Sequence, residues 1–182
     1  MDLTGIILAG GKSSRMGEDK GLMSFEGKPM IQHIIDVVKP LVNNLIIIAN
    51  DQEYEQFGYT VYRDLIKNKG PLAGIYTGLT HSNTEKNLVL SCDVPFVNEA
   101  ILKLLIDSCE GVDVVIPKKD NRTHQLIGVY DKSCTEIFKS ELEDDQLKLK
   151  LAIEKLNYKA INANLIDDKI FNNINSRNDI EA

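Results

Sequence analysis

Runs of hydrophobic residues alternate along this chain with segments in which hydrophobic residues recur every three or four positions. The runs are rich in isoleucine, valine and leucine and end at polar or glycine-containing turns, which is typical of strands buried on both faces. They predict strands at 4–8, 44–49, 60–62, 87–91, 113–116, 125–130 and 159–163. The helical spacing predicts helices at 29–39, 71–80, 133–142 and 146–156. A further helix, capped by Asn98, carries Ile101, Leu104 and Leu105, and a short terminal helix follows Asn175.

This alternation predicts a fold of the α/β class, a Rossmann-like three-layer sandwich whose mostly parallel sheet is covered on both faces. The 182 residues are 43% hydrophobic and contain no repeat, low-complexity segment or linker, so we expect a single domain over residues 1–182. Ligands of such sheets bind at the carboxyl ends of the strands. The residues that follow each predicted strand are therefore the candidates for a functional site.

Composition narrows the possible classes of protein. The net charge of −6 disfavours DNA or RNA as a main partner, and no hydrophobic run approaches the ~20 residues that span a bilayer. The chain begins with a strand-like segment, so a secretory signal is not expected. Its three cysteines are scattered, which fits reduced thiols in the cytoplasm. The three histidines are scattered too, so a zinc site is not expected.

The first predicted strand ends at a glycine pair. Gly10 and Gly11 open a loop of small, polar and basic residues that includes Arg15 and Lys20. Glycines let the backbone turn N–H groups towards phosphate oxygens, and basic side chains offset phosphate charge. The pattern G-x-x-x-x-G-K-S/T fails, because Ile6 stands where its first glycine is required, and G-x-G-x-x-G fails as well. Considered alone, the segment fits a polyphosphate loop and a simple glycine turn about equally well.

Residues 8–20 closely resemble the signature L-A-G-G-x-S-x-R-M-G-x-D-K of the molybdenum cofactor guanylyltransferases. The matching residues are Leu8, Ala9, Gly10, Gly11, Ser13, Arg15, Met16, Gly17, Asp19 and Lys20. The resemblance runs from about residue 4 to residue 180. It implies the nucleotide-diphospho-sugar transferase type of sandwich, with this loop around the triphosphate of GTP. Leu8, Ala9, Gly10, Gly11 and Lys20 are then nucleotide-binding residues, and Arg15 and Lys20 have catalytic roles.

Further candidates follow the later strands. Asn50 follows the second strand, Asp64 follows the short third strand, and 70–75 reads Gly-Pro-Leu-Ala-Gly-Ile. From the residues alone, asparagine and aspartate are ordinary turn residues at such places. The resemblance implies instead that Asn50 and Asp64 contact the nucleotide, because this family carries an asparagine, an aspartate and G-P-L-A-G around guanine and ribose.

Ser91-Cys92-Asp93-Val94-Pro95 ends the third strong strand. A carboxylate at such a strand end, facing a phosphate loop, suits Mg²⁺, which prefers oxygen ligands and often combines one or two carboxylates with substrate phosphates. The alternative is an aspartate that caps the turn before Pro95. The segment resembles the family's C-D-x-P, which implies that Asp93 is catalytic, binds the metal and contacts the nucleotide. Cys92 is expected to be a small buried residue and not a nucleophile.

Two later segments match the family in part. Arg122, His124 and Leu126 match G-R-x-H-P-L, which lies on the pterin side, although Asn121 and Gln125 replace its glycine and proline. His124 either touches the substrate or is an exposed bystander. Asn173 and Asn175 match F-x-N-x-N-T-P-E-D. Asn175 caps the last helix, or one of the two asparagines faces the metal and phosphate.

The resemblance implies transfer of GMP from Mg·GTP to the phosphate of molybdopterin or its molybdenum-loaded form. It also implies transient contacts with cofactor-synthesis proteins and recipient molybdoenzymes. One alternative is a CTP-dependent or sugar-phosphate nucleotidyltransferase on the same fold. Cytidylyltransferase relatives commonly have alanine at the position of Gly10, so the glycine favours GTP. Another alternative is a non-catalytic nucleotide-binding module, against which Lys20 and Asp93 both argue.

Overall fold

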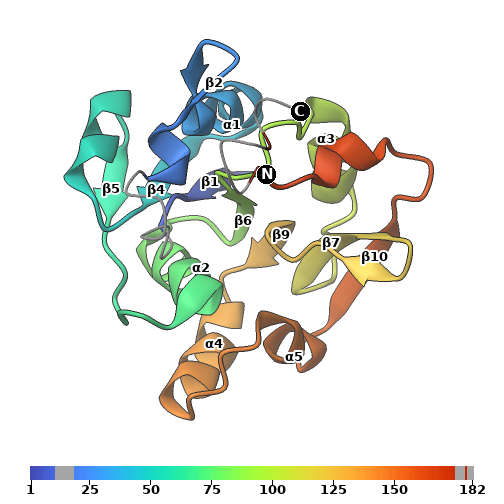
Figure 1. The fold of residues 1–182 in the computed structure, drawn as a ribbon. Helices are drawn as coiled ribbons and strands as arrows, with labels where there is room; N and C mark the ends of the chain where they lie inside the picture. Colours follow the sequence, from blue (N-terminus) through green and yellow to red (C-terminus); the bar gives the residue numbers. More distant parts are fainter. Residues whose placement is uncertain (11–18, 175–178, 180–182) are drawn as a thin grey trace.

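The computed structural model describes residues 1–10, 19–174 and 179. Eight of the strands in these residues form one sheet, in the order β10-β7-β9-β6-β1-β4-β5 with β8 paired to β7 (Figure 1). The sheet strands are β1 (Leu3–Leu8), β4 (Asn44–Ile48), β5 (Thr60–Tyr62), β6 (Lys86–Ser91), β7 (Val114–Lys119), β8 (Arg122–Thr123), β9 (Ile127–Asp131) and β10 (Tyr158–Asn162). A separate hairpin joins β2 (Ser24–Phe25) to β3 (Lys28–Pro29).

Helices cover both faces of the sheet, which makes the three layers that the sequence predicts (Figure 1). One face packs against α1 (Met30–Val38) and α3 (Glu99–Asp107). The other face packs against α2 (Gly70–His81), α4 (Cys134–Glu143) and α5 (Leu149–Glu154). Short 3₁₀ turns complete the chain: η1 (Lys20–Leu22), η2 (Lys39–Leu41), η3 (Gln52–Phe57) and η4 (Asp168–Phe171).

Strand β1 lies near the middle of the sheet, and every one of its residues is buried there. Successive side chains point to opposite faces, so Ile7 joins the core beneath α1 and α3, while Ile6 and Leu8 join the core beneath α2. A continuous hydrophobic run is what such a position requires, since neither face meets water. The sequence pattern therefore placed this strand correctly.

Most of the sheet is parallel, as predicted. Strands β1, β4, β5 and β6 run in the same direction, and β10 is parallel to β7. Strands β8 and β9 are the exceptions, because β8 pairs antiparallel with β7 and β9 pairs antiparallel with both β6 and β7. The four neighbouring parallel strands bring their carboxyl ends to one edge of the sheet.

The boundaries differ from the predictions in several places. The helix predicted over 146–156 is shorter, because Asp145 has a φ of +57° and α5 begins only at Leu149. The two-residue strands of the β2–β3 hairpin were not predicted. The expected terminal helix after Asn175 begins outside the described residues. Asn98 does cap α3, where its side chain accepts a hydrogen bond from the Ile101 amide at 3.2 Å.

A glycine sets the distance between α2 and the central strand. A Cβ atom at Gly78 would lie 2.5 Å from Ile6 Cγ2, which is closer than packed carbon atoms approach. We expect Gly78→Ala to lower the free energy of unfolding, because overpacking costs about 1–3 kcal/mol and helix propensity returns at most about 1 kcal/mol. Denaturant unfolding would measure this, with Thr80→Ala on the exposed side of α2 as the control. An unchanged or more stable Gly78→Ala protein would contradict the prediction.

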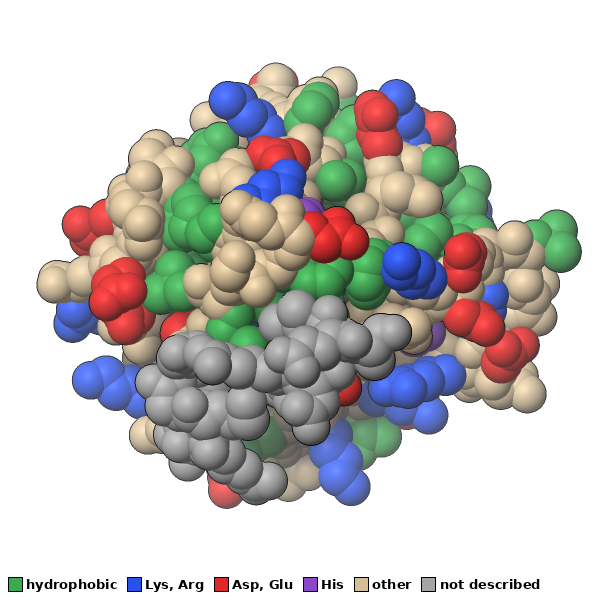
Figure 2. Space-filling model, turned by 45° about the horizontal axis from the view of Figure 1, so that its top comes forward, with side chains coloured by type: hydrophobic (Ala, Val, Ile, Leu, Met, Phe, Trp, Pro, Cys, Tyr) green, Lys and Arg blue, Asp and Glu red, His purple; other side chains and the backbone are tan. Residues whose placement is uncertain are grey.

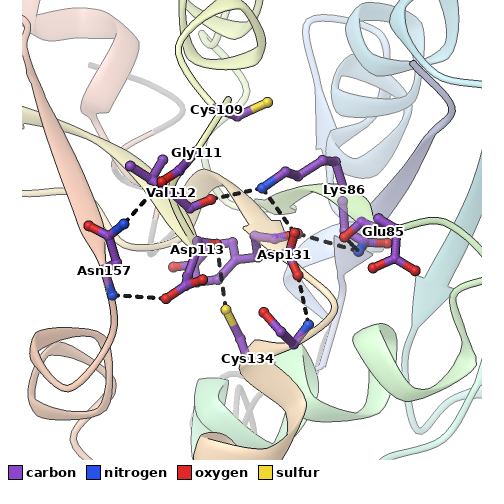
Figure 3. A network of polar contacts seen from close by, with 12 residues as sticks. Glu85, Lys86, Cys109, Gly111, Val112, Asp113, Asp131, Cys134 and Asn157 are labelled. Atoms are coloured by element: carbon purple, nitrogen blue, oxygen red, sulfur yellow. Dashed lines mark hydrogen bonds and ion pairs between the residues drawn. The ribbon is translucent and has the colours of Figure 1, made fainter.

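A polar network joins strands at the opposite edge of the sheet (Figure 3). Lys86 forms an ion pair with Asp131 at 2.9 Å and donates a hydrogen bond to the Val112 carbonyl at 2.8 Å. The Asp131 carboxylate also accepts the Ser133 amide at 2.9 Å. Burial acts to raise the pKa of Asp131, but the hydrogen bonds from Ser133 and Lys86 outweigh it and lower the pKa. This network stabilises β6 against β9, far from the carboxyl ends of the parallel strands.

Candidate active site

Four predicted site residues occupy equivalent places just after the parallel strands β1, β4, β5 and β6. The last paired residues are Leu8, Ile48, Tyr62 and Ser91, and they stand side by side in the register. Gly10, Asn50, Asp64 and Asp93 each come two residues later. Backbone bonds extend the alignment by one residue, since Ala9 donates to Ile48, Ala49 to Tyr62 and Cys92 to Leu8, at 2.9 to 3.0 Å. The register therefore places these four residues along one edge.

A cleft of about 850 Å³ lies along part of this edge. Its described lining comes from the segments after β1, β4 and β5 and from the start of α2: Gly10, Asp19, Asn50, Asp51, Gln52, Arg63, Asp64, Asn68, Gly70 and Pro71. Within this lining, three side chains are carboxylates and Arg63 is the cation. No role for Asp51, Gln52, Arg63 or Asn68 was expected from the sequence. Their presence in the cleft depends on how the connections after β4 and β5 fold.

The amide of Asn50 contacts the carboxylate of Asp64. Asn50 Nδ2 donates to Asp64 Oδ2 at 3.0 Å, and both residues line the cleft. Asp64 is held further by its neighbour, because the Leu65 amide donates to Thr77 Oγ1 at 3.0 Å on buried α2. The hydrogen bond between Asn50 and Asp64 uses the amide nitrogen of Asn50 and one oxygen of Asp64. The side-chain oxygen of Asn50 and the second oxygen of Asp64 take no part in it. The two residues that the resemblance assigned to nucleoside binding thus form one unit.

Gly10 leaves space beside this pair. A Cβ atom at Gly10 would lie 3.7 Å from Asn50 Nδ2, which is ordinary contact distance. An alanine would fit without a clash but would occupy room next to the amide. Leu8 lines a narrow pocket of about 50 Å³ behind the cleft, and Ala9 is buried with its amide used by the sheet. Gly11 and Arg15 lie outside the described residues.

Among the described residues, one carboxylate oxygen of Asp93 accepts a hydrogen bond and the other has no partner. Oδ2 accepts a hydrogen bond from Asn173 Nδ2 at 3.3 Å, and the Asp93 carbonyl accepts the Ile174 amide at 2.9 Å. Oδ1 is buried and has no hydrogen-bond partner among the described residues. A buried carboxylate oxygen without a donor is costly unless something positive meets it. This oxygen is therefore suited to a cation.

The geometry around Asp93 suits a metal ion whose other ligands are water molecules and substrate oxygens. In residues 1–10, 19–174 and 179 there is no cluster of three or more His, Cys, Asp or Glu side chains that would enclose an ion. A single carboxylate suits an ion that completes its shell with water and phosphate oxygens. Asn173 contacts Asp93, and its expected place facing the metal and phosphate stays a prediction. Asn175 lies outside the described residues.

Lys20 follows Asp19 and begins the 3₁₀ turn η1. Asp19 caps this turn, because its Oδ1 accepts the Gly21 amide at 3.0 Å. Lys20 also contributes to the charge around Cys92, the residue that precedes Asp93. Burial raises the pKa of the Cys92 thiol well above its usual range, Asp93 and Asp19 raise it further, and Lys20 opposes them. Lys20 therefore lies within electrostatic range of Cys92, and Cys92 is buried, as predicted.

The segment matched to the pterin side forms a tight hairpin. Asp120 and Asn121 turn the chain between β7 and β8 with φ angles of +46° and +65°. Asparagine tolerates this left-handed conformation, so Asn121 can serve where the family pattern has glycine. His124 is half-buried and stacks on Phe171 with ring centroids 4.3 Å apart, so it is not fully exposed, and its contact with the substrate stays a prediction. Burial and the nearby Arg122 and Lys119 lower its pKa, which favours the neutral ring.

The surface charges and the lengths of the helices bear on two other classes of protein, those that bind nucleic acid and those that span a membrane. On the face seen in Figure 2, acidic and basic side chains are interspersed among the residues coloured by type, instead of forming one basic surface. Proteins that follow a nucleic-acid backbone usually carry such a surface. No helix in the described part of the chain combines the length and hydrophobicity needed to cross a bilayer.

Comparison with known proteins gives concordant matches. Residues 5–157 match the MobA-like NTP transferase domain. A probable molybdenum cofactor guanylyltransferase of Flavobacterium johnsoniae is 40% identical over 98% of this chain and 94% of its own length. A molybdenum cofactor guanylyltransferase of Desulfosudis oleivorans is 32% identical, with 98% and 93% covered. The crystal structure of molybdopterin-guanine dinucleotide biosynthesis protein A from Archaeoglobus fulgidus has the same fold, with a TM-score of 0.81, 24% identity, and 98% and 95% covered.

Proposed function

Because the chain belongs to the family of MobA-like NTP transferase domains, we propose that it transfers GMP from GTP to the phosphate of molybdopterin, free or loaded with molybdenum, and releases pyrophosphate. The observation that carries this proposal is the order of groups along the sheet edge. The Asn50–Asp64 pair stands at the ends of β4 and β5 and Gly10 at the end of β1. Asp93, whose Oδ1 has no hydrogen-bond partner among the described residues, stands at the end of β6.

The span of this edge fits a nucleoside triphosphate. Strands β5, β4, β1 and β6 are neighbours, and three strand spacings cover roughly 14 Å. A nucleotide that lies across them would place its base and ribose near Asn50 and Asp64 and its phosphates over the end of β1. Its α-phosphate would then come near Asp93 and Lys20, where the acceptor must attack.

The reaction needs positioning more than it needs a base. The attacking group is a phosphate monoester with a second pKa near ~6, so it is largely dianionic at neutral pH. No side chain has to remove a proton from it. The barrier arises from repulsion between two anions and from the need for in-line geometry. In this proposal Lys20 and Arg15 offset the triphosphate charge, and the backbone after Gly10 donates hydrogen bonds to it.

Asp93 would hold Mg²⁺ through Oδ1, with Asn173 orienting its other oxygen. When bound, the ion supplies positive charge to the α-phosphate and to the departing pyrophosphate. The acceptor would approach from the side of His124, a half-buried ring that stacks on the buried Phe171. Contacts with cofactor-synthesis proteins and recipient molybdoenzymes remain predictions from the family resemblance.

We expect kcat/KM for GTP to exceed that for CTP at least about tenfold, a difference of ~1.4 kcal/mol in transition-state binding. The reason is that the Asn50–Asp64 pair and the room beside Gly10 suit a purine that carries both donors and acceptors. Pyrophosphate release with molybdopterin as acceptor would measure this for each nucleotide, with the reaction lacking molybdopterin as the control. Equal or better turnover with CTP would reject the guanylyl assignment. No turnover with any nucleotide would favour a non-catalytic module.

A further inference from the structure

We propose that Tyr54 is a positioning residue for Lys20, and that it acts through Asp19. Its buried hydroxyl group holds the start of η1 against η3, and this contact sets where the lysine stands next to Asp19, which lines the cleft. The proposal deepens the proposed function and rests on it, because Lys20 is assigned there to the triphosphate. Neither the sequence pattern nor the family signature gives a role to Tyr54.

Two hydrogen bonds meet at one carboxylate oxygen of Asp19. Tyr54 is completely buried, and its hydroxyl group donates to Asp19 Oδ1. The same oxygen accepts the Gly21 amide at 3.0 Å. A buried tyrosine hydroxyl needs a partner, and a bond to a carboxylate is stronger than one between neutral groups. Asp19 is therefore held from η3 while it caps the turn that begins with Lys20.

Close packing reinforces this contact on the other side of Lys20. A Cβ atom at Gly21 would overlap the Tyr54 hydroxyl oxygen and would lie 3.1 Å from two ring carbons. Only glycine lets the backbone approach the ring so closely. The residues on both sides of Lys20 are thus in contact with a single tyrosine. Burial raises the pKa of Tyr54 far above its usual range, with Cys92 and Asp19 adding to the shift, so the hydroxyl group keeps its proton and remains a donor.

Tyr54 also belongs to the segment that carries nucleoside-side residues. Asp51 caps η3, because its Oδ1 accepts the Glu53 amide at 2.9 Å, and Asp51 and Gln52 both line the cleft. Asn50 precedes them directly. The tyrosine therefore connects the segment expected at the base with the segment expected at the phosphates. The distance between these two segments is what a bound nucleotide has to match.

A double-mutant cycle tests the proposal through the dissociation constant of Mg·GTP, measured by calorimetry without acceptor. We expect Tyr54→Phe to raise the Kd about tenfold in the wild-type background. In the Lys20→Ala background the same substitution should change the Kd less than twofold, because the group that it positions is already missing. Tyr130→Phe is the matched control, since Tyr130 is equally buried and its hydroxyl group donates to the Gln125 carbonyl at 2.5 Å. It should act alike in both backgrounds.

A second measurement does not depend on GTP. Hydrogen exchange of the Gly21 amide, followed by NMR in the protein without ligand, should be at least about fivefold faster in Tyr54→Phe and unchanged in Tyr130→Phe. The proposal is overturned if Tyr54→Phe weakens GTP equally in both backgrounds, if it leaves the Kd unchanged, or if Gly21 exchange does not respond. If the wild-type chain does not bind GTP at all, the proposed function falls, and the exchange rate alone decides whether Tyr54 fixes η1.

Discussion

Replacing Lys20 with alanine is expected to reduce kcat/KM for GMP transfer roughly 10²- to 10³-fold, which is the usual cost of removing one preorganised donor to developing charge. The free energy of unfolding should change by less than about 1 kcal/mol. The reason for this contrast is the place of the residue. Lys20 is half-exposed at the start of a 3₁₀ turn whose cap and following glycine are held by other side chains. The side chain of Lys20 is not part of the buried core, so its removal should change the free energy of unfolding little.

Steady-state kinetics and thermal unfolding of the same preparations would measure both effects. Lys103→Ala is the matched control, because Lys103 is an exposed lysine on α3 that pairs with Glu99 at 2.7 Å, away from the cleft. It should leave kcat/KM within about twofold, as expected for a surface ion pair. Lys20→Arg should recover part of the activity, since it keeps the charge but not the point-like ammonium group. A Lys20→Ala protein with near-normal kinetics and a much lower melting temperature would make the lysine structural.

The central part of the fold could be predicted from the sequence, because strands buried on both faces need continuous runs of branched hydrophobic residues. Strands β1, β4 and β6 have such runs and appeared within one or two residues of their predicted bounds. The direction of β9 could not be predicted, since Ile127–Asp131 has the composition of either kind of central strand. The β2–β3 hairpin was missed because two-residue strands are too short to show any periodicity.

The candidate site was predictable only in part, and for a similar reason. The rule that ligands bind at the carboxyl ends of parallel strands led to Gly10, Asn50 and Asp93, and the family signature singled them out. The contact between Asn50 and Asp64 depends on the register of β4 against β5, which no local pattern records. A role for Tyr54 could not be predicted for the same reason. Its hydroxyl group gains a role only when η3 is folded against a turn 35 residues earlier in the chain.

Asp93→Asn is expected to raise the Mg²⁺ concentration for half-maximal activity at least about tenfold, or ~1.4 kcal/mol, with activity recovering in part at high Mg²⁺. The substitution keeps the size of the side chain and an oxygen but removes the charge that would neutralise the ion. Asn173 and the Ile174 amide now contact Asp93 through Oδ2 and the backbone carbonyl. An asparagine can accept both bonds, so the variant should fold.

Asp131→Asn provides the matched comparison, because Asp131 is also a half-buried carboxylate but lies at the opposite edge of the sheet (Figure 3). Its loss should lower stability, since Lys86 would remain without its ion-pair partner, yet the Mg²⁺ dependence should match that of the wild type. Titration of Mg²⁺ at fixed GTP against the rate of GMP transfer would compare the three proteins. If Asp93 only shapes the turn before Pro95, asparagine should serve as well, and the curves of Asp93→Asn and the wild type would superimpose. The buried oxygen Oδ1 argues against that outcome, because a turn-forming aspartate has no need of a second oxygen that is hidden from water and contacts no donor among the described residues.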